Sequence, residues 1–221
     1  MLRLTQYGLR EVAVCTVVLG AMTAVGGLLY WPAAIPPALL LGWALWFFRD
    51  PPRRPADSGG LLAPADGTVV DITPVGPDSP LGRTGTRIGI FMSIFSAHVN
   101  RSPADAVVES VEHKCGGFVD ARRPDAADVN ECAWIRLRLA HGRAEFPLIV
   151  RQVAGLIARR IVTRLVPGQR LSAGQRFGMI KFGSRAELWV PQELIGRLAV
   201  RRGDRVRAGH HVLVYLSEER P

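Results

Sequence analysis

One stretch of the chain, residues 12–48, is largely apolar and contains no charged side chain. As a single helix it would be about 55 Å long, which exceeds the ~30 Å hydrocarbon core of a bilayer. The segment 31–37 carries three prolines, which end one helix and permit the start of another. The sequence therefore predicts two helices, roughly 12–30 and 37–48, that form a membrane-anchoring hairpin. The second helix is short for a full crossing, so a transmembrane and a monotopic hairpin both fit the pattern.

Positive charges flank this apolar stretch: Arg3 and Arg10 precede it, and Arg49, Arg53 and Arg54 follow it. Because positive flanks favour the cytoplasmic side, the rest of the chain is expected on the cytoplasmic side of the cell membrane. A secretory signal peptide is the alternative, but a second apolar run follows at once and no clean small-residue cleavage site precedes it. Residues 1–55 are thus expected to be an anchor that ends in a stiff, basic linker.

The charge balance favours an anionic partner. The formal net charge is +9, and of 28 basic residues only Lys114 and Lys181 are lysines, which leaves 26 arginines. This suits an acidic phospholipid surface, whereas nucleic acid is not expected, since zinc-finger spacing, an RNP-like motif and a dense basic helix are missing from the sequence. Three cysteines without a CxxC pair indicate a reducing compartment without a disulfide framework, and no metal site is expected.

Residues 56–221 read as a mainly β (α+β) catalytic domain, because the segments are short, β-branched and punctuated by Gly, Pro and Asp. Two segments, 63–70 and 202–213, look like parts of one supersecondary unit, and the second follows the G-D-x-V-x-x-G pattern of lipoyl-like domains. We therefore expect a barrel-sandwich-hybrid-like β-sandwich behind the helical hairpin. The predicted strands are 67–73, 86–95, 106–113, 133–139, 144–153, 160–165, 177–182, 186–190 and 211–216.

The dipeptide Gly183-Ser184 can support backbone chemistry. Glycine permits backbone geometry closed to other residues and leaves its carbonyl uncrowded where the Ser184 hydroxyl would attack. That attack is an N-to-O acyl shift, and β-elimination of the resulting ester leaves dehydroalanine, which hydrolyses to a pyruvoyl group. The dipeptide alone is most often an ordinary turn, so the neighbouring residues must decide.

Several blocks resemble phosphatidylserine decarboxylase proenzymes, most closely the short form of that family. They are APADG at 63–67, FSAHVNRSP at 95–103, QVAGLIARRI at 152–161 and RFGMIKFGSR at 176–185, with a similar FRDP junction at 48–51. The resemblance implies self-cleavage between Gly183 and Ser184 into a β chain, 1–183, and an α chain, 184–221, that stay together as a heterodimer. It also implies a membrane-bound carboxy-lyase that converts phosphatidylserine to phosphatidylethanolamine in phospholipid biosynthesis.

The resemblance also assigns roles to individual residues. Asp66, His98 and Ser184 match the family's self-cleavage triad, in which His98 would deprotonate the Ser184 hydroxyl and Asp66 would orient and stabilise the imidazolium. Asn100, Arg101 and Arg185 are candidates for binding the lipid head group, and solvated surface charge is the alternative for each arginine.

Two positions depart from the family pattern. Arg101 stands where longer members carry a second histidine, so proton transfer must fall on His98 or on a histidine elsewhere. Cys132 replaces the arginine of a Gly-x-Phe…Asn-Glu-Arg block at 116–118 and 130–132, which leaves the part of this segment in substrate binding open.

A pyruvoyl group fits the composition better than pyridoxal phosphate. Decarboxylation needs an electron sink, and pyridoxal phosphate needs a lysine, but no phosphate-cradling glycine loop accompanies Lys114 or Lys181. The pyruvoyl ketone would form an imine with the serine amine, and His98 would protonate the product carbanion. Two rivals are a membrane-anchored serine hydrolase, for which the G-x-S-x-G elbow is missing, and a non-enzymatic lipoyl-like adaptor, which requires that the Gly183–Ser184 bond stay intact. A lipoyl or biotinyl carrier would need a lysine at a hairpin tip, and neither lysine lies in such a turn. An ether-linked serine lipid fits as well as an ester-linked one.

Overall fold

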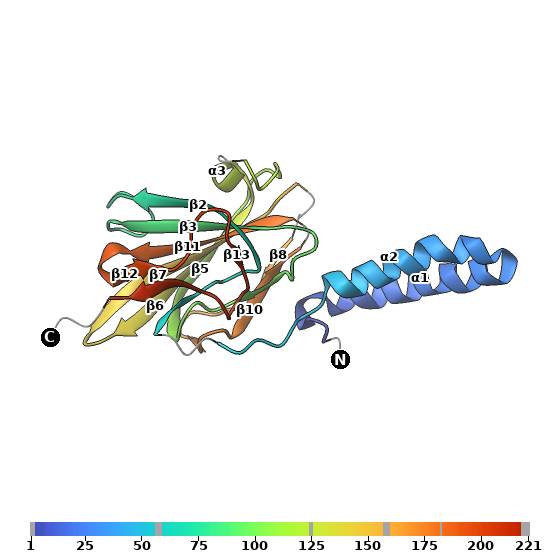
Figure 1. The fold of residues 1–221 in the computed structure, drawn as a ribbon, viewed down its shortest axis with the longest axis horizontal. Coiled ribbons are helices and arrows are strands. Elements are labelled where there is room, and N and C mark those ends of the chain that lie inside the picture. The colour runs from blue at the N-terminus through green and yellow to red at the C-terminus, as the bar shows by residue number, and fades with distance from the viewer. Residues whose placement is uncertain (1–2, 56–58, 124–125, 157–159, 182, 218–221) are drawn as a thin grey trace. The chain divides into compact units, whose positions relative to one another are not determined.

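The computed structural model describes the chain except for residues 1–2, 56–58, 124–125, 157–159, 182 and 218–221. The chain divides into two compact units, residues 1–52 and 53–221. Each unit is described by itself (Figure 1).

The first unit is a helical hairpin. After the short 3-10 helix η1 (Gln6–Gly8), α1 (Leu9–Leu29) leads through η2 (Trp31–Ala34) into α2 (Ile35–Phe47). Prolines stand in the first turns of η2 and α2, where a missing N–H costs no helical hydrogen bond. At the open end the backbone N–H of Thr5 donates to the carbonyl of Phe48 at 2.9 Å, and that of Asp50 donates to Arg3 at 2.7 Å. The predicted hairpin is therefore present, with Arg3, Arg10 and Arg49 at its open end.

The hairpin exposes its apolar side chains. Among the residues that the structure describes, one helix, Gln6–Leu29, is long and apolar enough to cross a membrane by length and composition, whereas the second apolar helix is shorter. Most of the large exposed hydrophobic side chains of the described chain belong to this unit, for example Leu28, Leu29 and Trp31. Exposed apolar surface of this extent marks a site of membrane or protein contact.

The second unit is mainly β, as predicted, and the pairings between its described strands are antiparallel. Its largest sheet has eight strands in the order β13-β2-β3-β11-β7-β6-β5-β9, and two three-stranded sheets have the orders β1-β14-β12 and β4-β10-β8. The strands are β1 (Gly60–Leu62), β2 (Gly67–Val75), β3 (Gly85–Met92), β4 (Val99–Arg101), β5 (Ala106–Lys114), β6 (Cys132–His141), β7 (Ala144–Val153), β8 (Ile161–Thr163), β9 (Arg170–Leu171), β10 (Arg176–Ile180), β11 (Ser184–Pro191), β12 (Ile195–Leu198), β13 (Arg205–Val206) and β14 (Val212–Leu216), with α3 (Ala126–Val129) and η3 (Gln192–Leu194) between strands.

One core joins the three sheets. Its fully buried side chains include Ile88 and Leu188 of the large sheet, Leu213 of the β1-β14-β12 sheet and Phe177 of the β4-β10-β8 sheet. We call the face of the large sheet that carries this core its inner face. The two segments 63–70 and 202–213 do form one unit, because β13 pairs with β2 and the backbone N–H of Val69 donates to the carbonyl of Asp204. The mainly β, sandwich-like prediction is thereby confirmed.

The strand boundaries differ from the prediction at the two places that matter most for function. The strand predicted over 86–95 ends at Met92, because residues 93–96 form a turn in which the N–H of Ser96 donates to the carbonyl of Ser93. The strand predicted over 177–182 ends at Ile180, and Ser184 begins β11. The sequence predicts this strand only from residue 186, because Ser184 and Arg185 carry no β-branched or apolar signal.

Central strand β11 is held on both sides. Its residues pair with β3 from Ser184↔Met92 to Pro191↔Gly85, and with β7 from Arg185↔Val153 to Trp189↔Ile149. Because side chains alternate along a strand, Ser184 and Ala186 face the core while Arg185 and Glu187 face the opposite, outer side.

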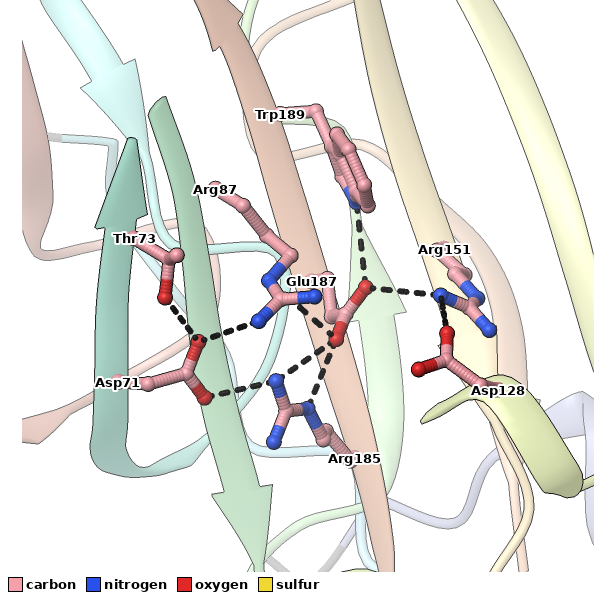
Figure 2. Close-up of polar contacts among 8 residues, drawn as sticks. All are labelled: Asp71, Thr73, Arg87, Asp128, Arg151, Arg185, Glu187 and Trp189. Atoms are coloured by element: carbon pink, nitrogen blue, oxygen red, sulfur yellow. Dashed lines mark hydrogen bonds and ion pairs between the residues drawn. The ribbon is translucent and has the colours of Figure 1, made fainter. Parts of the chain in front are cut away.

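An ion network with a buried centre covers the outer face of β11 (Figure 2). Its centre is Glu187, whose side chain is fully buried. The Glu187 carboxylate accepts hydrogen bonds from Arg185 Nε at 2.9 Å and Trp189 Nε1 at 3.1 Å. Arg151 Nη1 lies 3.5 Å from the same carboxylate and 3.8 Å from that of Asp128.

The network extends across β3 to β2. Arg185 Nη2 lies 2.7 Å from Asp71 Oδ2, and Arg87 Nη2 lies 3.5 Å from Asp71 Oδ1. Between them Gly89 of β3 has no side chain, and a Cβ there would lie 2.4 Å from the Asp71 carboxylate and 2.8 Å from the Arg185 guanidinium. Three arginines thus face three carboxylates, and together they tie β2, β3, β11 and β7 to α3.

We expect Glu187→Ala to lower the free energy of unfolding by about 3–5 kcal/mol, because it leaves arginines buried without their shared counter-ion. The matched control is Glu193→Ala, which removes an exposed pair with Arg83 and should cost less than about 1 kcal/mol. Both are measured by urea unfolding of the full chain in detergent, in a Ser184→Ala background that prevents the predicted self-cleavage. Equal costs for the two variants would contradict a structural role for the network.

Candidate active site

Ser184 lies at the buried start of β11. Its side chain is fully buried, and its hydroxyl donates to the sulfur of Met92, its register partner on β3, at 3.3 Å. A thioether is a weak acceptor, so this hydroxyl can turn toward another partner at little cost. Gly183 has a φ of +60°, a left-handed conformation that glycine adopts without strain.

The carbonyl of Gly183 packs directly on Gly155. A Cβ on Gly155 would lie 1.9 Å from the Gly183 carbonyl oxygen, so only glycine fits at position 155. Asn130 holds the adjoining segment in place, because its Nδ2 donates to the carbonyls of Val119 and Ala154 at 2.8 Å each. The Gly-x-Phe…Asn-Glu block therefore lies next to the Gly183–Ser184 peptide and supports it.

Cys132, the departure in that block, is fully buried among Ala127, Val153 and Trp134. The small apolar side chain packs within this cluster, and nothing in the described contacts links it to substrate binding.

His98 is fully buried and directly precedes β4 in the chain. One hydrogen bond defines the tautomer of its neutral ring. Its Nδ1 lies 2.9 Å from the carbonyl oxygen of Ser96. Because a carbonyl only accepts hydrogen bonds, Nδ1 carries the proton in the neutral ring and Nε2 carries the lone pair. Nε2 is thus the atom that can accept a proton.

Two crossovers bring His98 and Ser184 to neighbouring segments. The first connection runs from Met92 at the end of β3, the register partner of Ser184, to His98 before β4. The second runs from Ile180 at the end of β10 to Ser184 at the start of β11. The backbone N–H of Ile180 donates to the carbonyl of His98 at 3.3 Å, so His98 lies beside the end of the strand that precedes Ser184 in the chain. Both the predicted base and the predicted nucleophile thus lie where the large sheet meets the β4-β10-β8 sheet.

A pair of amides bridges these two sheets. Asn100 Nδ2 donates to the carbonyl of Pro64, which leaves its Oδ1 as the acceptor for Gln152 Nε2 at 2.8 Å. This orientation fixes Gln152 Oε1 as a buried acceptor, and among the described residues nothing donates to it. Gln152 pairs with Ala186, so it is a diagonal neighbour of Ser184 on the inner face, with about 7–8 Å between such Cβ atoms.

Asp66 lies in the turn before β2 and has both carboxylate oxygens occupied. Arg53 Nη2 lies 2.6 Å from its Oδ2, and the backbone N–H of Ala208 donates to its Oδ1 at 2.7 Å. The Asp66 turn packs on β4, because the carbonyl of Pro64 accepts from the backbone N–H of Arg101 at 3.0 Å. Asp66 therefore lies in a turn that contacts β4, and β4 begins directly after His98.

The three predicted head-group ligands lie in different places. Asn100 is fully buried in the amide bridge, and Arg101 is buried with its Nη1 donating to the carbonyl of Gly174 at 3.1 Å. Arg185 points to the outer face and is bound by Glu187 and Asp71, so the structure does not bring it together with Ser184. Lipid binding by these three residues stays a prediction.

Sequence reasoning missed four residues of this site: Arg53, Asn130, Gly155 and Gln152. Each was visible only as part of a family-like block or of the basic linker, and no pattern indicated its contact. Among the described residues, no group of three or more His, Cys, Asp and Glu side chains is arranged to hold a metal ion.

The turn that binds Asp66 contains a histidine with a shifted pKa. The backbone N–H of Arg207 donates to His211 Nδ1 at 3.0 Å, which requires the neutral ring. Burial first, and then the nearby charge of His210, lowers the pKa of His211. In the unfolded chain a histidine takes up its proton near pH ~6.5. The stabilisation from His211 is therefore complete above that value and is lost as pH falls through the lower folded-state pKa.

We expect the melting temperature to fall on acidification from about pH 7.5 to about pH 5.5 by more in the unmodified His211 chain than in His211→Asn. Asparagine supplies a side-chain acceptor in place of Nδ1 but does not titrate. The measurement is thermal unfolding across this pH range, with both chains in the Ser184→Ala background. Equal pH dependence of the two chains would show that His211 does not titrate as inferred.

Comparisons with known proteins show the family of this chain. Residues 40–214 match the family model described as phosphatidylserine decarboxylase. The chain is 37% identical over 198 residues to the phosphatidylserine decarboxylase proenzyme of Carboxydothermus hydrogenoformans, which covers 89% of this chain and 91% of the relative. It is 42% identical over 185 residues to the proenzyme of the same name from Symbiobacterium thermophilum, with 82% and 84% covered, and 39% identical over 195 residues to that of Paramagnetospirillum magneticum, with 86% and 79% covered. The chain belongs to the phosphatidylserine decarboxylase family.

Proposed function

We propose that this chain is a carboxy-lyase proenzyme that cuts itself between Gly183 and Ser184 and then decarboxylates phosphatidylserine to phosphatidylethanolamine. The observation that carries the proposal is the scissile peptide itself. A left-handed Gly183 with its carbonyl against Gly155 precedes a fully buried Ser184 at the start of a central strand. The proenzyme name of the relatives supports the same conclusion. The hydrolase and adaptor alternatives are not favoured by these relatives.

Self-cleavage would use residues of this chain alone. The Ser184 hydroxyl leaves its weak contact with Met92 and attacks the Gly183 carbonyl carbon while His98 Nε2 accepts its proton. The C–N bond breaks, and an ester and a free amine result. β-Elimination then releases the Gly183 carboxylate and leaves dehydroalanine, whose hydrolysis releases ammonia and gives the pyruvoyl group. Asp66, on the adjoining segment, supplies negative charge that stabilises the imidazolium.

The surroundings of Ser184 fit a pyruvoyl group. Met92, Ala186 and Gly155 present apolar or small neighbours, and the buried start of β11 excludes bulk water. When present, the group supplies a ketone and an adjacent amide that accept the electrons released with CO₂. His98 would deliver a proton to the product carbon, and Gln152 Oε1 would accept a hydrogen bond from the substrate amine.

The two chains would stay together after cleavage. The α chain would begin with β11, which is paired along its length with β3 and over five residues with β7, both in the β chain. Arg185 and Glu187 of the α chain bind Asp71 and Arg151 of the β chain on the outer face. Cleavage therefore need not release the new terminus from the site.

The hairpin would place this site at a membrane. Substrate tails stay in the bilayer, so the head group must be reached at the surface, and the apolar hairpin with its basic open end suits that task. Arg3, Arg10 and Arg49 on that end favour the cytoplasmic side of the cell membrane for the catalytic unit.

The mass of the purified protein under denaturing conditions tests the proposal. We expect two chains for the natural sequence, the smaller with a blocked N-terminus at position 184, and one inactive chain for Ser184→Ala. For His98→Ala we expect cleavage slowed by about 100-fold or more, the usual contribution of a general base. An uncut chain that still releases CO₂ from phosphatidylserine would overturn the mechanism.

Gly155→Ala should impair cleavage without unfolding the domain, because the added Cβ would displace the Gly183 carbonyl and a misplacement of about 1 Å can cost about 100-fold in rate. The matched control is Gly76→Ala, where a Cβ would meet nothing within 4 Å. The time course of cleavage after synthesis in vitro gives both rates. Equal rates for the two variants would remove the Gly155 contact from the mechanism.

A further inference from the structure

The basic linker after the hairpin is docked on the catalytic unit at three successive residues. Arg53 pairs with Asp66 at 2.6 Å, and the carbonyl of Arg54 accepts a hydrogen bond from His210 Nδ1 at 3.0 Å. Pro55 packs so closely on Gly174 that a Cβ there would lie 3.2 Å from the proline ring. The linker is therefore part of the folded catalytic unit, although the sequence suggested only a spacer.

The contact between Arg53 and Asp66 is shielded from solvent. Each side chain is 14% exposed, so the ion pair is screened less than a surface pair. A charge-assisted hydrogen bond of this kind is short and directional. With Ala208 N–H on the other oxygen, the carboxylate of Asp66 has a fixed rotation.

The same contacts connect the linker to the segment that carries the scissile peptide. Gly174 accepts from Arg101 Nη1 through its carbonyl, and it lies in the turn just before β10. Strand β10 then leads through residues 181–183 to Ser184. The linker thus contacts both the Asp66 turn and the turn before β10, the strand that precedes Ser184 in the chain.

We propose that Arg53 is a positioning residue for self-cleavage: it holds the Asp66 carboxylate in one orientation, and so couples the linker at 53–55 to the active site. This rests on the proposed function, in which Asp66 stabilises the protonated His98. In the part of the chain that the structure describes, the side-chain contact of Arg53 is with Asp66, through which it would act on the reacting groups. Arg53 is the first residue after the hairpin unit, and in this proposal it contributes to the active site.

The test compares cleavage rates of the full chain synthesised into lipid nanodiscs and followed by intact mass. Arg53→Ala should slow cleavage by about tenfold or more, the scale expected when a catalytic group is slightly misplaced. Arg54→Ala is the matched control, because it removes the same charge one residue later, from an exposed side chain whose described contact is made by the backbone. It should cleave within about twofold of the natural sequence.

Two further comparisons separate positioning from general stability. Arg53→Lys restores the charge and Arg53→Gln only a donor, so lysine should recover more of the rate than glutamine, even if Arg53→Ala does not fold. In the Asp66→Asn background, Arg53→Ala should add no further loss, because coupled residues are not additive.

The outcomes distinguish this inference from the function on which it rests. Equal rates for Arg53→Ala and Arg54→Ala, a glutamine variant as fast as the lysine variant, or independent losses in the double variant would each overturn the role of Arg53. A natural sequence that stays uncut would instead overturn the proposed function.

Discussion

The position of β11 between β3 and β7 is the constraint on which the site depends. A strand paired on both sides cannot shift by one residue without breaking both ladders and exchanging its two faces. Such a shift would bury Arg185 in the core and move Ser184 to the outer face. The ion network raises the cost of that error, because Glu187 and Asp71 bind Arg185 only in the observed register. The same strand pairing thus stabilises the sheet and places Ser184 on its inner face.

The network also explains a composition that looks unfavourable at first. Burying Glu187, Arg151 and Arg185 costs desolvation, and apolar residues of similar size would often be as stable. Register specificity is what the charges add, and here we infer that it serves the chemistry on the opposite face. Gly89 makes this arrangement geometrically possible, because the Asp71 carboxylate and the Arg185 guanidinium lie over its backbone where a side chain would stand.

The sequence predicted the architecture well and the site only in part. The continuous apolar stretch and its prolines located the hairpin, and β-branched segments located nine strands. These features are visible in the sequence because they depend on residues that are neighbours in the chain. The short strand β4 and the start of β11 escaped notice, since polar residues such as Asn100 and Arg185 occupy them. Their partners lie far away in the chain, at Gln152 and Asp71, and no local pattern reports such a contact. The resemblance named His98 but could not show that the Ser96 carbonyl sets its tautomer.

Arg53 is a second case in which the sequence does not show a contact that the fold makes. In the sequence it belongs to a run of prolines and arginines whose composition indicates a spacer, and composition alone cannot distinguish Arg53 from Arg54. The fold separates them, because one side chain reaches Asp66 while the other is exposed. A short linker that supplies an ionic partner to the active site has little freedom to lengthen or shift. The length of this linker is therefore constrained by the proposed chemistry, whereas composition alone would leave it free to vary.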